Sequence, residues 1–319
     1  MTNRITSILS IRYPLVQAPM NWINTAEMVA AVSNAGALGV LGPNAGPKTE
    51  NGVRLSTQER VSRVLRQINS LTAKPYGINI ISAPDEATRA YALKNIAAAA
   101  DAGVRIFAVV GTYEPAIYKA IKDLGGIILH RELDPTPEAA HRAQEEGADI
   151  IVATGRDEGG LLPHGQAGTF TIVPQIVDAV TVPVLAAGGI NDIRGVRAAF
   201  ALGAEGVYVG SRFAVADECA TAAAAKEAIL RADGTELVYV SDLERSLPTR
   251  YALEMNRRYR AGEPSAALEA EVHHNGGLRP AMLEGRLDDG IISVNTGVGQ
   301  IKSGGMCADI VAEMMADFV

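Results

Sequence analysis

The stretch PVLAAGGINDIRGVRAAFALGAEGVYVGSRF, residues 183–213, decides the fold. It contains two apolar runs, PVLAA and GVYVG, and each leads directly into a glycine turn, at Gly188-Gly189 and at Gly210-Ser211. Between the two runs lies a segment with helical spacing, residues 191–203. Parallel strands that are buried on both faces read as continuous apolar runs. The stretch therefore predicts two consecutive strand–helix units of a parallel sheet.

The same unit recurs along the preceding chain. In the first unit, the strand YPLVQA (residues 13–18) precedes a helix that Thr25 is placed to cap and Gly36 to end. Further apolar runs are LGVLG, YGINII, RIFAVV, GIILH and DIIVA, and a helical segment follows each of them, at 56–71, 85–102, 113–124, 136–147 and 171–180. The helical segment 217–231 follows GVYVG. Eight such units predict an α/β fold, a closed (β/α)8 TIM barrel over residues 1–232. An open doubly wound sheet is the rival, but it rarely needs eight uninterrupted units.

The repeating pattern stops after residue 232. Residues 233–290 mix helical patches with glycine and proline breaks, which predicts a small, mainly helical cap subdomain. Residues 291–319 are expected to return to the barrel and to end in a helix at about 306–319. A cap beside the strand ends of a barrel is where specificity is usually set. The alternative for this segment is an oligomerisation arm, so a homo-oligomer stays open.

Composition and charge narrow the class of protein. Hydrophobic residues make up 48% and charged residues 20% of the 319 residues, which is typical of a soluble globular protein. The net charge of -7 does not favour binding to the negatively charged backbone of nucleic acids, so the expected partner is a small-molecule substrate. No apolar run reaches the roughly 20 residues that span a bilayer, and the N-terminus lacks a secretory signal. We therefore expect no membrane association and a cytoplasmic location.

Cysteine and histidine give no sign of a metal site. Cys219 and Cys307 are too few for a disulfide framework, and we interpret both as ordinary buried thiols. His273 and His274 are adjacent on a predicted helix and point to different faces, without an evident third ligand. We predict no metal.

The two glycine turns predict a phosphate site. They fall after the seventh and eighth strands, where barrels commonly bind phosphate. Glycine lets the backbone approach a ligand with its N–H groups, and the helix that begins near Asn191 adds a favourable dipole. One Gly-Gly pair alone would favour a simple tight turn. Two such turns on successive strands favour a phosphate.

Several motifs together resemble one enzyme family. YPLVQAPM, GINI, GADIIVATGRDEGG, PVLAAGGI and GAEGVYVGSRF look like the family of nitronate monooxygenases (2-nitropropane dioxygenases) and type II enoyl-acyl-carrier-protein reductases. The resemblance covers nearly all of residues 13–215 and, more weakly, ISVNTGVGQI near the C-terminus. A more distant likeness to the inosine monophosphate dehydrogenase barrel lacks that family's loop with a catalytic cysteine.

The resemblance implies FMN as the cofactor. Its phosphate would lie on Gly188, Gly189, Gly210 and Ser211, and its ring over Ala18, Pro19 and Met20. The further contacts that the resemblance implies are Asn79, Thr154, Gly155, Gly159 and Gly160. From the residues alone, proline stiffens the turn after the first strand and Met20 offers a polarizable surface to a flat ring. Asn79 is equally suited to capping a turn.

One loop departs from the family pattern. In many family members the loop after the sixth strand resembles the motif Gly-x-Glu-Ala-Gly-Gly-His. The corresponding loop of this chain is GRDEGGLLPHG, with Leu161 in place of the histidine. Three alternatives follow. A rearranged loop brings His164 to the flavin; the histidine-dependent step is absent; or His130, which ends the fifth predicted strand, supplies the imidazole.

The predicted function is an FMN-dependent oxidoreductase with NAD(P)H as the electron donor. The acceptor would be an enone, an enoyl thioester or a quinone, because hydride transfer needs stacking and orientation more than an acid or base. The alternatives are a nitronate monooxygenase that uses dioxygen and, in another class, a non-redox phosphate-binding barrel such as an isomerase or aldolase. In the cap, Arg257, Arg258 and Arg260 would either meet nucleotide phosphates or form a solvated helix face.

Overall fold

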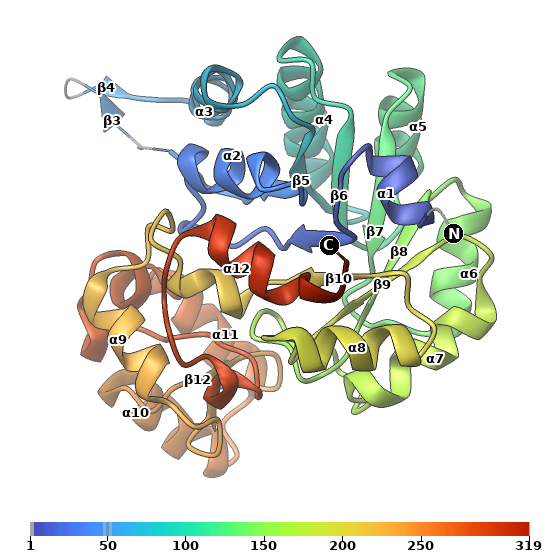
Figure 1. Cartoon of the computed structure of the whole chain (residues 1–319). Coiled ribbons are helices and arrows are strands. Elements are labelled where there is room, and N and C mark those ends of the chain that lie inside the picture. The colour runs from blue at the N-terminus through green and yellow to red at the C-terminus, as the bar shows by residue number, and fades with distance from the viewer. Residues whose placement is uncertain (1–2, 47–48, 51–52, 319) are drawn as a thin grey trace.

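Eight parallel strands form the centre of the molecule (Figure 1). The computed structural model describes residues 3–46, 49–50 and 53–318. The strand order is β1-β10-β9-β8-β7-β6-β5-β2, and a parallel bridge between Val16 and Leu38 closes the sheet between β1 and β2. The TIM barrel prediction is therefore confirmed. The barrel strands are β1 Leu15–Gln17, β2 Gly39–Leu41, β5 Tyr76–Ser82, β6 Ile106–Gly111, β7 Ile127–Arg131, β8 Ile150–Thr154, β9 Val184–Ala187 and β10 Gly206–Val209.

Helices surround the strands where the sequence predicts them. Thr25 caps the first of these helices, since its Oγ1 accepts the Met28 amide at 2.9 Å, and Gly36 ends the turn with φ +94°. A short hairpin, β3 Thr49–Glu50 and β4 Val53–Arg54, precedes α3. The helices are α2 Ala26–Asn34, α3 Thr57–Leu71, α4 Glu86–Asp101, α5 Pro115–Asp123, α6 Pro137–Glu145, α7 Thr169–Ala179, α8 Ile193–Ala201 and α9 Ala223–Arg231.

Side chains alternate between the barrel interior and the outer layer of helices. In β7, Leu129 belongs to the interior cluster, whereas its neighbour Ile128 packs in the outer cluster. A helix that the sequence patterns did not reveal, α1 Arg4–Leu9, adds Ile5 and Leu9 to the interior cluster. The alternation fixes which residues at the strand ends face the interior.

The chain after α9 forms a hairpin and several helices. These elements are β11 Val238–Tyr239, β12 Arg245–Ser246, α10 Arg250–Arg260, α11 Ser265–His274, the π-turn η2 Arg279–Leu283 and α12 Cys307–Met314. The segment has an apolar cluster of its own, which includes Val240, Met255 and Leu268. α12 packs against α2 and α8, and Figure 1 shows it lying across the front of the barrel.

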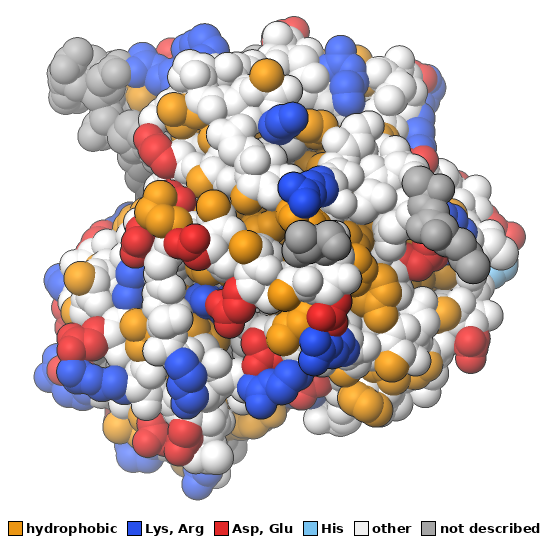
Figure 2. All heavy atoms as spheres, in the orientation of Figure 1, with side chains coloured by type: hydrophobic (Ala, Val, Ile, Leu, Met, Phe, Trp, Pro, Cys, Tyr) orange, Lys and Arg blue, Asp and Glu red, His pale blue; other side chains and the backbone are white. Residues whose placement is uncertain are grey.

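The surface is polar and mixed in charge, and both cysteines are buried. Figure 2 shows acidic and basic side chains intermingled on the face that it displays. Within the described part of the chain, every helix is too short or too polar to cross a membrane. Cys219 and Cys307 are both buried, as expected, and burial raises the pKa of each thiol.

Candidate active site

Two of the predicted glycines border open space at the strand ends. Gly189 follows β9 with φ +74°, and a Cβ added there would come no closer than 3.4 Å to another heavy atom, the Cβ of Asp157. Gly210 follows β10, and the nearest atom to an added Cβ is the Cβ of Ala18, at 3.8 Å. The structure therefore places Ala18 beside Gly210. Both glycines leave room for a ligand beside the backbone.

Three other predicted glycines are required by the chain's own packing. A Cβ at Gly188 would lie 2.8 Å from Thr169 Oγ1, and one at Gly159 would lie 2.5 Å from the Asn295 amide. At Gly155 a Cβ would collide with the backbone of Thr169. Gly160 is less confined, because a Cβ there would meet Glu158 Oε2 at 3.2 Å. Some glycines of these loops are therefore needed for close packing within the chain, whereas Gly189 and Gly210 border an open space, here called the glycine cradle.

The turn after β10 presents backbone amides at the start of a short helix. The 3-10 helix η1, Ser211–Val215, begins there, and the first amides of a helix have no intrahelical acceptor. The helix dipole of α8 was expected to favour a bound phosphate, but its N-terminus is capped by the chain itself. Asp192 caps this helix, and its carboxylate accepts the amides of Arg194 at 2.9 Å and Gly195 at 3.3 Å. The positive end of α8 is therefore already occupied by the chain's own carboxylate.

The C-terminal segment completes the glycine turn. Asn191 and Asn295 exchange side-chain hydrogen bonds of 2.9 and 2.8 Å, and Asn191 also donates to the Gly297 carbonyl at 2.8 Å. Ser211 Oγ accepts the Asn295 amide at 2.9 Å. In the sequence, this contact is indicated only by the weak family likeness of ISVNTGVGQI.

Apolar side chains line the mouth of the barrel. The Ala18 amide donates to Val209 at 2.8 Å, and the Met20 amide donates to Asn24 Oδ1 at 2.5 Å, which fixes the turn through Pro19. Alternation along β5 directs Asn79 and Ile81 to the interior, because Ile78 and Ile80 pack outside. Asn79 Nδ2 donates to Ala108 at 3.0 Å, whereas Ile81 is 40% exposed. A flat apolar group would cover this surface.

Strand β7 ends one residue later than expected, and alternation with the inward-facing Leu129 turns His130 outward. The strand runs to Arg131, so Arg131 faces the interior and His130 faces the outer helices. His130 is buried, with Nδ1 2.8 Å from the hydroxyl of Tyr118 on α5. The expectation that His130 faces the strand-end site is therefore wrong.

The loop between β8 and α7 turns His164 toward Asp134. The His164 amide donates to Asp134 Oδ1 at 2.5 Å, and Nδ1 lies 2.8 Å from Asp134 Oδ2. The imidazole is 68% exposed and borders a cavity of about 230 Å³ lined by Asp134, Pro135, Thr136, Pro163, His164, Gly165, Ala167 and Ile172. Leu161, at the position of the family histidine, is 47% exposed. The structure thus pairs His164 with Asp134 and does not bring it to the predicted FMN contacts.

A polar cluster lies inside the barrel below these loops. Arg131 Nε donates to Thr154 Oγ1 at 3.3 Å, and Nη2 pairs with Glu158 Oε2 at 2.5 Å. Burial raises the pKa of Glu158, although Arg131 and then Arg245 act to lower it. Tyr208 points inward from β10, and burial raises the pKa of its phenol. Sequence patterns did not identify Arg131, Glu158 or Tyr208 as site residues.

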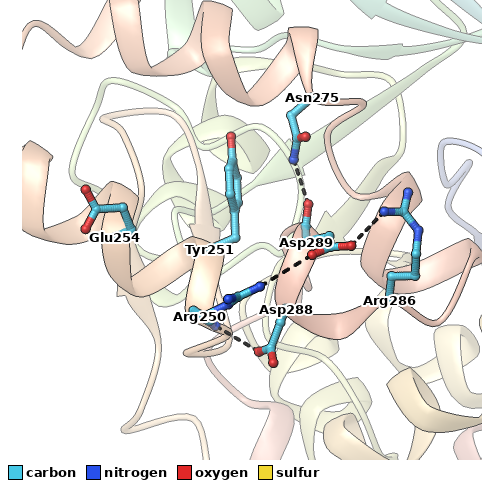
Figure 3. A pocket seen from close by; sticks show the side chains of 7 residues that line it. All are labelled: Arg250, Tyr251, Glu254, Asn275, Arg286, Asp288 and Asp289. Carbon is cyan, nitrogen blue, oxygen red and sulfur yellow. Dashed lines mark hydrogen bonds and ion pairs between the residues drawn. The ribbon is translucent and has the colours of Figure 1, made fainter.

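A larger cavity lies in the segment after α9, and none of the predicted contacts lines it (Figure 3). It has a volume of about 380 Å³ and is lined by Arg250, Tyr251, Glu254, Asn275, Arg286, Asp288 and Asp289. Figure 3 shows both arginines turned toward Asp289, and Arg286 Nη1 donates to its carboxylate at 2.7 Å. Both arginines of the cavity are therefore paired with its own carboxylate Asp289.

Two of the three predicted arginines of α10, Arg257 and Arg258, form ion pairs. Arg257 binds Glu254 at 2.7 Å, and Arg258 binds Glu263 at 2.6 Å and Glu271 at 2.8 Å. These ion pairs agree with the interpretation of a solvated helix face for this segment.

Fold and geometry together define a TIM barrel with an open glycine cradle and an apolar mouth, which fits a flat cofactor that carries a phosphate. The family model described as nitronate monooxygenase matches residues 2–317. The chain belongs to the nitronate monooxygenase family and is an oxidoreductase, which removes the non-redox alternative.

Relatives and solved structures agree with this family. The chain is 30% identical over 315 residues to a protein named probable nitronate monooxygenase from Staphylococcus aureus (strain JH9), a match that covers 85% of this chain and 84% of the relative. FabK from Thermotoga maritima is similar in structure, with a TM-score of 0.86 and 27% identity over 100% of this chain and 96% of that chain. A nitroalkane oxidase from Streptomyces ansochromogenes has the same fold, with a TM-score of 0.78 and 23% identity over 98% and 97% of the two chains.

Proposed function

We propose that this chain is an FMN-dependent reductase that passes a hydride from NAD(P)H through FMN to an electron-poor acceptor such as an enone, an enoyl thioester or a quinone. The observation that carries the proposal is the position of the imidazole. Leu161 stands where the family places a histidine, and His164 is held by Asp134 on the exposed side of its loop. Nitronate oxidation profits from a base or donor beside the flavin, a contribution of about 10²- to 10⁴-fold. Leu161 cannot supply it.

The proposed cofactor site uses the open part of the glycine cradle. Gly189 and Gly210 give the phosphate access to the backbone, and the first amides of η1 are the donors. Ala18, Met20 and Ile81 supply the apolar surface for the ring. Bound FMN supplies the hydride chemistry, and the protein has to hold it, orient it and exclude water.

We further propose that residues 233–290 are the cap that shapes the acceptor site. The cap is fastened to the loop after β8, because the Leu162 amide donates to the Leu243 carbonyl at 2.8 Å and Arg245 Nη2 donates to the Glu158 carbonyl at 2.6 Å. These contacts keep the loop against the mouth. A segment held over the mouth in this way would help to exclude water from hydride transfer.

The test separates the two half-reactions. Purified protein should be yellow with bound FMN, and anaerobic stopped-flow mixing with NADH and NADPH should bleach the flavin. Reoxidation by an enone, an enoyl thioester, a quinone and a nitronate with dioxygen then identifies the acceptor. His164→Ala should leave flavin reduction nearly unchanged. Protein that takes up no FMN, or reduced flavin that none of the first three acceptors reoxidises, would refute the proposal.

A nitronate monooxygenase is the second candidate. It is favoured by the 30% identity to a protein of that name and by the pair of His164 and Asp134, since a carboxylate at Nδ1 orients an imidazole as a base. Efficient nitronate turnover that collapses in His164→Ala would establish this function instead.

A further inference from the structure

The buried pair of Arg131 and Glu158 has no part in the function proposed so far. The two side chains are 10% and 11% exposed, and their charged atoms are 2.5 Å apart. They come from the end of β7 and from the loop after β8, so they lie inside the carboxyl end of the barrel, below the mouth. A buried ion pair is costly to desolvate and gives weak evidence of a stabilising role. Its position at the mouth suggests a role toward a ligand.

The pair is held from the cap side. Arg245 of β12 is buried, and its Nη2 donates to the carbonyls of Arg156 at 3.0 Å and Glu158 at 2.6 Å. These two hydrogen bonds fix the peptide groups that carry the Glu158 side chain. The carboxylate therefore meets Arg131 in a set position.

The guanidinium of Arg131 is only partly engaged. Nε is bound to Thr154 and Nη2 to Glu158, whereas Nη1 has no acceptor among the residues that the structure describes. Within the same described residues, Glu158 Oε1 and the Tyr208 hydroxyl are enclosed and lack a hydrogen-bond partner. Buried polar groups normally have partners, so the two enclosed atoms, together with the unengaged Nη1 of Arg131, point to a polar group beside this cluster.

On the basis of the proposed function, we infer that Arg131 balances the additional negative charge of reduced FMN, and that Glu158 limits how much positive charge the cofactor meets. The ring, proposed to lie over Ala18 to Met20, would cross the mouth above this pair. Charge near the ring is one of the means by which a protein tunes a flavin. Since the reduced form carries more negative charge, a cation below the ring favours it over the oxidised form.

The experiment measures the midpoint potential of bound FMN by anaerobic spectroelectrochemistry at pH 8, with all variants compared in the same buffer. Glu158→Gln keeps the shape of the side chain and an acceptor for Arg131, and it should tighten the binding of reduced relative to oxidised FMN about tenfold. For a two-electron couple this is a rise of about 30 mV. Arg131→Gln should lower the potential by a similar amount, and the double variant should lie near the wild type.

Arg197→Gln is the matched control, because it breaks an arginine–carboxylate pair with Asp317 on the outer face of α8. Its potential should equal that of the wild type. If Arg131→Gln loses FMN or does not fold, Glu158→Gln decides alone. Holoprotein in which Glu158→Gln leaves the potential unchanged or lowers it would overturn the inference but not the proposed function. Wild-type protein that binds no FMN would overturn both.

Discussion

Replacing Gly210 by valine should weaken FMN binding while the barrel stays folded. The backbone at Gly210 has φ -107°, which other residues adopt, and an added Cβ would be 3.8 Å from its nearest neighbour, an ordinary contact. The free energy of unfolding of the flavin-free protein should therefore change by less than about 1 kcal/mol. The side chain would, however, fill space proposed for the cofactor. We expect at least a tenfold loss of FMN affinity, which corresponds to about 1.4 kcal/mol.

Two measurements on the same variant separate folding from binding. Quenching of FMN fluorescence gives the dissociation constant, and circular dichroism of the flavin-free protein gives its thermal midpoint. Gly165→Val is the control, because an added Cβ there has no heavy atom within 4 Å and Gly165 belongs to the outer cavity beside His164. An FMN affinity within about twofold of the wild type in well-folded Gly210→Val would show that the cofactor does not approach this backbone.

Three further substitutions test the packing and the charges. Gly188→Ala should cost roughly 2 kcal/mol more stability in urea unfolding than Gly103→Ala, because both have positive φ but a Cβ at Gly188 also lies 2.8 Å from Thr169 Oγ1; equal costs would contradict the packing role. Tyr208→Phe should leave the flavin-free protein as stable or up to about 1 kcal/mol more stable, since the removed hydroxyl has no partner among the described residues, and should weaken FMN binding if the hydroxyl meets the cofactor. Burial, with a smaller contribution from Glu269, raises the pKa of Glu244 from 4.5 to about 7, so its contribution to stability is full below pH 4.5 and is lost as the pH rises through 7. Glu244→Gln should remove that loss, at most about 3 kcal/mol at pH 8, and an unchanged slope of stability against pH between 5 and 8 would show that Glu244 titrates normally.

The fold could be predicted because its signals are local. Buried parallel strands read as apolar runs, and helix ends carry their own caps, as Thr25 and Gly36 show. The direction of a side chain at a strand end is less secure. His130 points outward and Arg131 into the barrel, because successive side chains in a strand point to opposite faces and Leu129 faces the interior.

Contacts between distant parts of the chain could not be predicted. Asn191 and Asn295 are 104 residues apart, and nothing in either local sequence indicates that they bind each other. The glycines present the same difficulty. Gly159 and Gly189 look alike in the sequence. An added Cβ at Gly159 would nevertheless collide with the Asn295 amide, whereas one at Gly189 would lie at an ordinary contact distance from Asp157. Whether a glycine serves a ligand or the chain's own packing depends on what the rest of the fold places beside it.

The cap contributes to the charge at the barrel mouth through one arginine. Arg245 holds the carbonyls of Arg156 and Glu158, and Glu158 in turn engages Arg131. Without the two hydrogen bonds from Arg245, the peptide groups of this loop would have to find other donors, and the carboxylate would be free to leave the guanidinium. An unpaired guanidinium in this position would be more costly than the pair, since a buried charge requires a partner. The cap and the strand end of β7 therefore form one electrostatic unit, although they are far apart in the sequence.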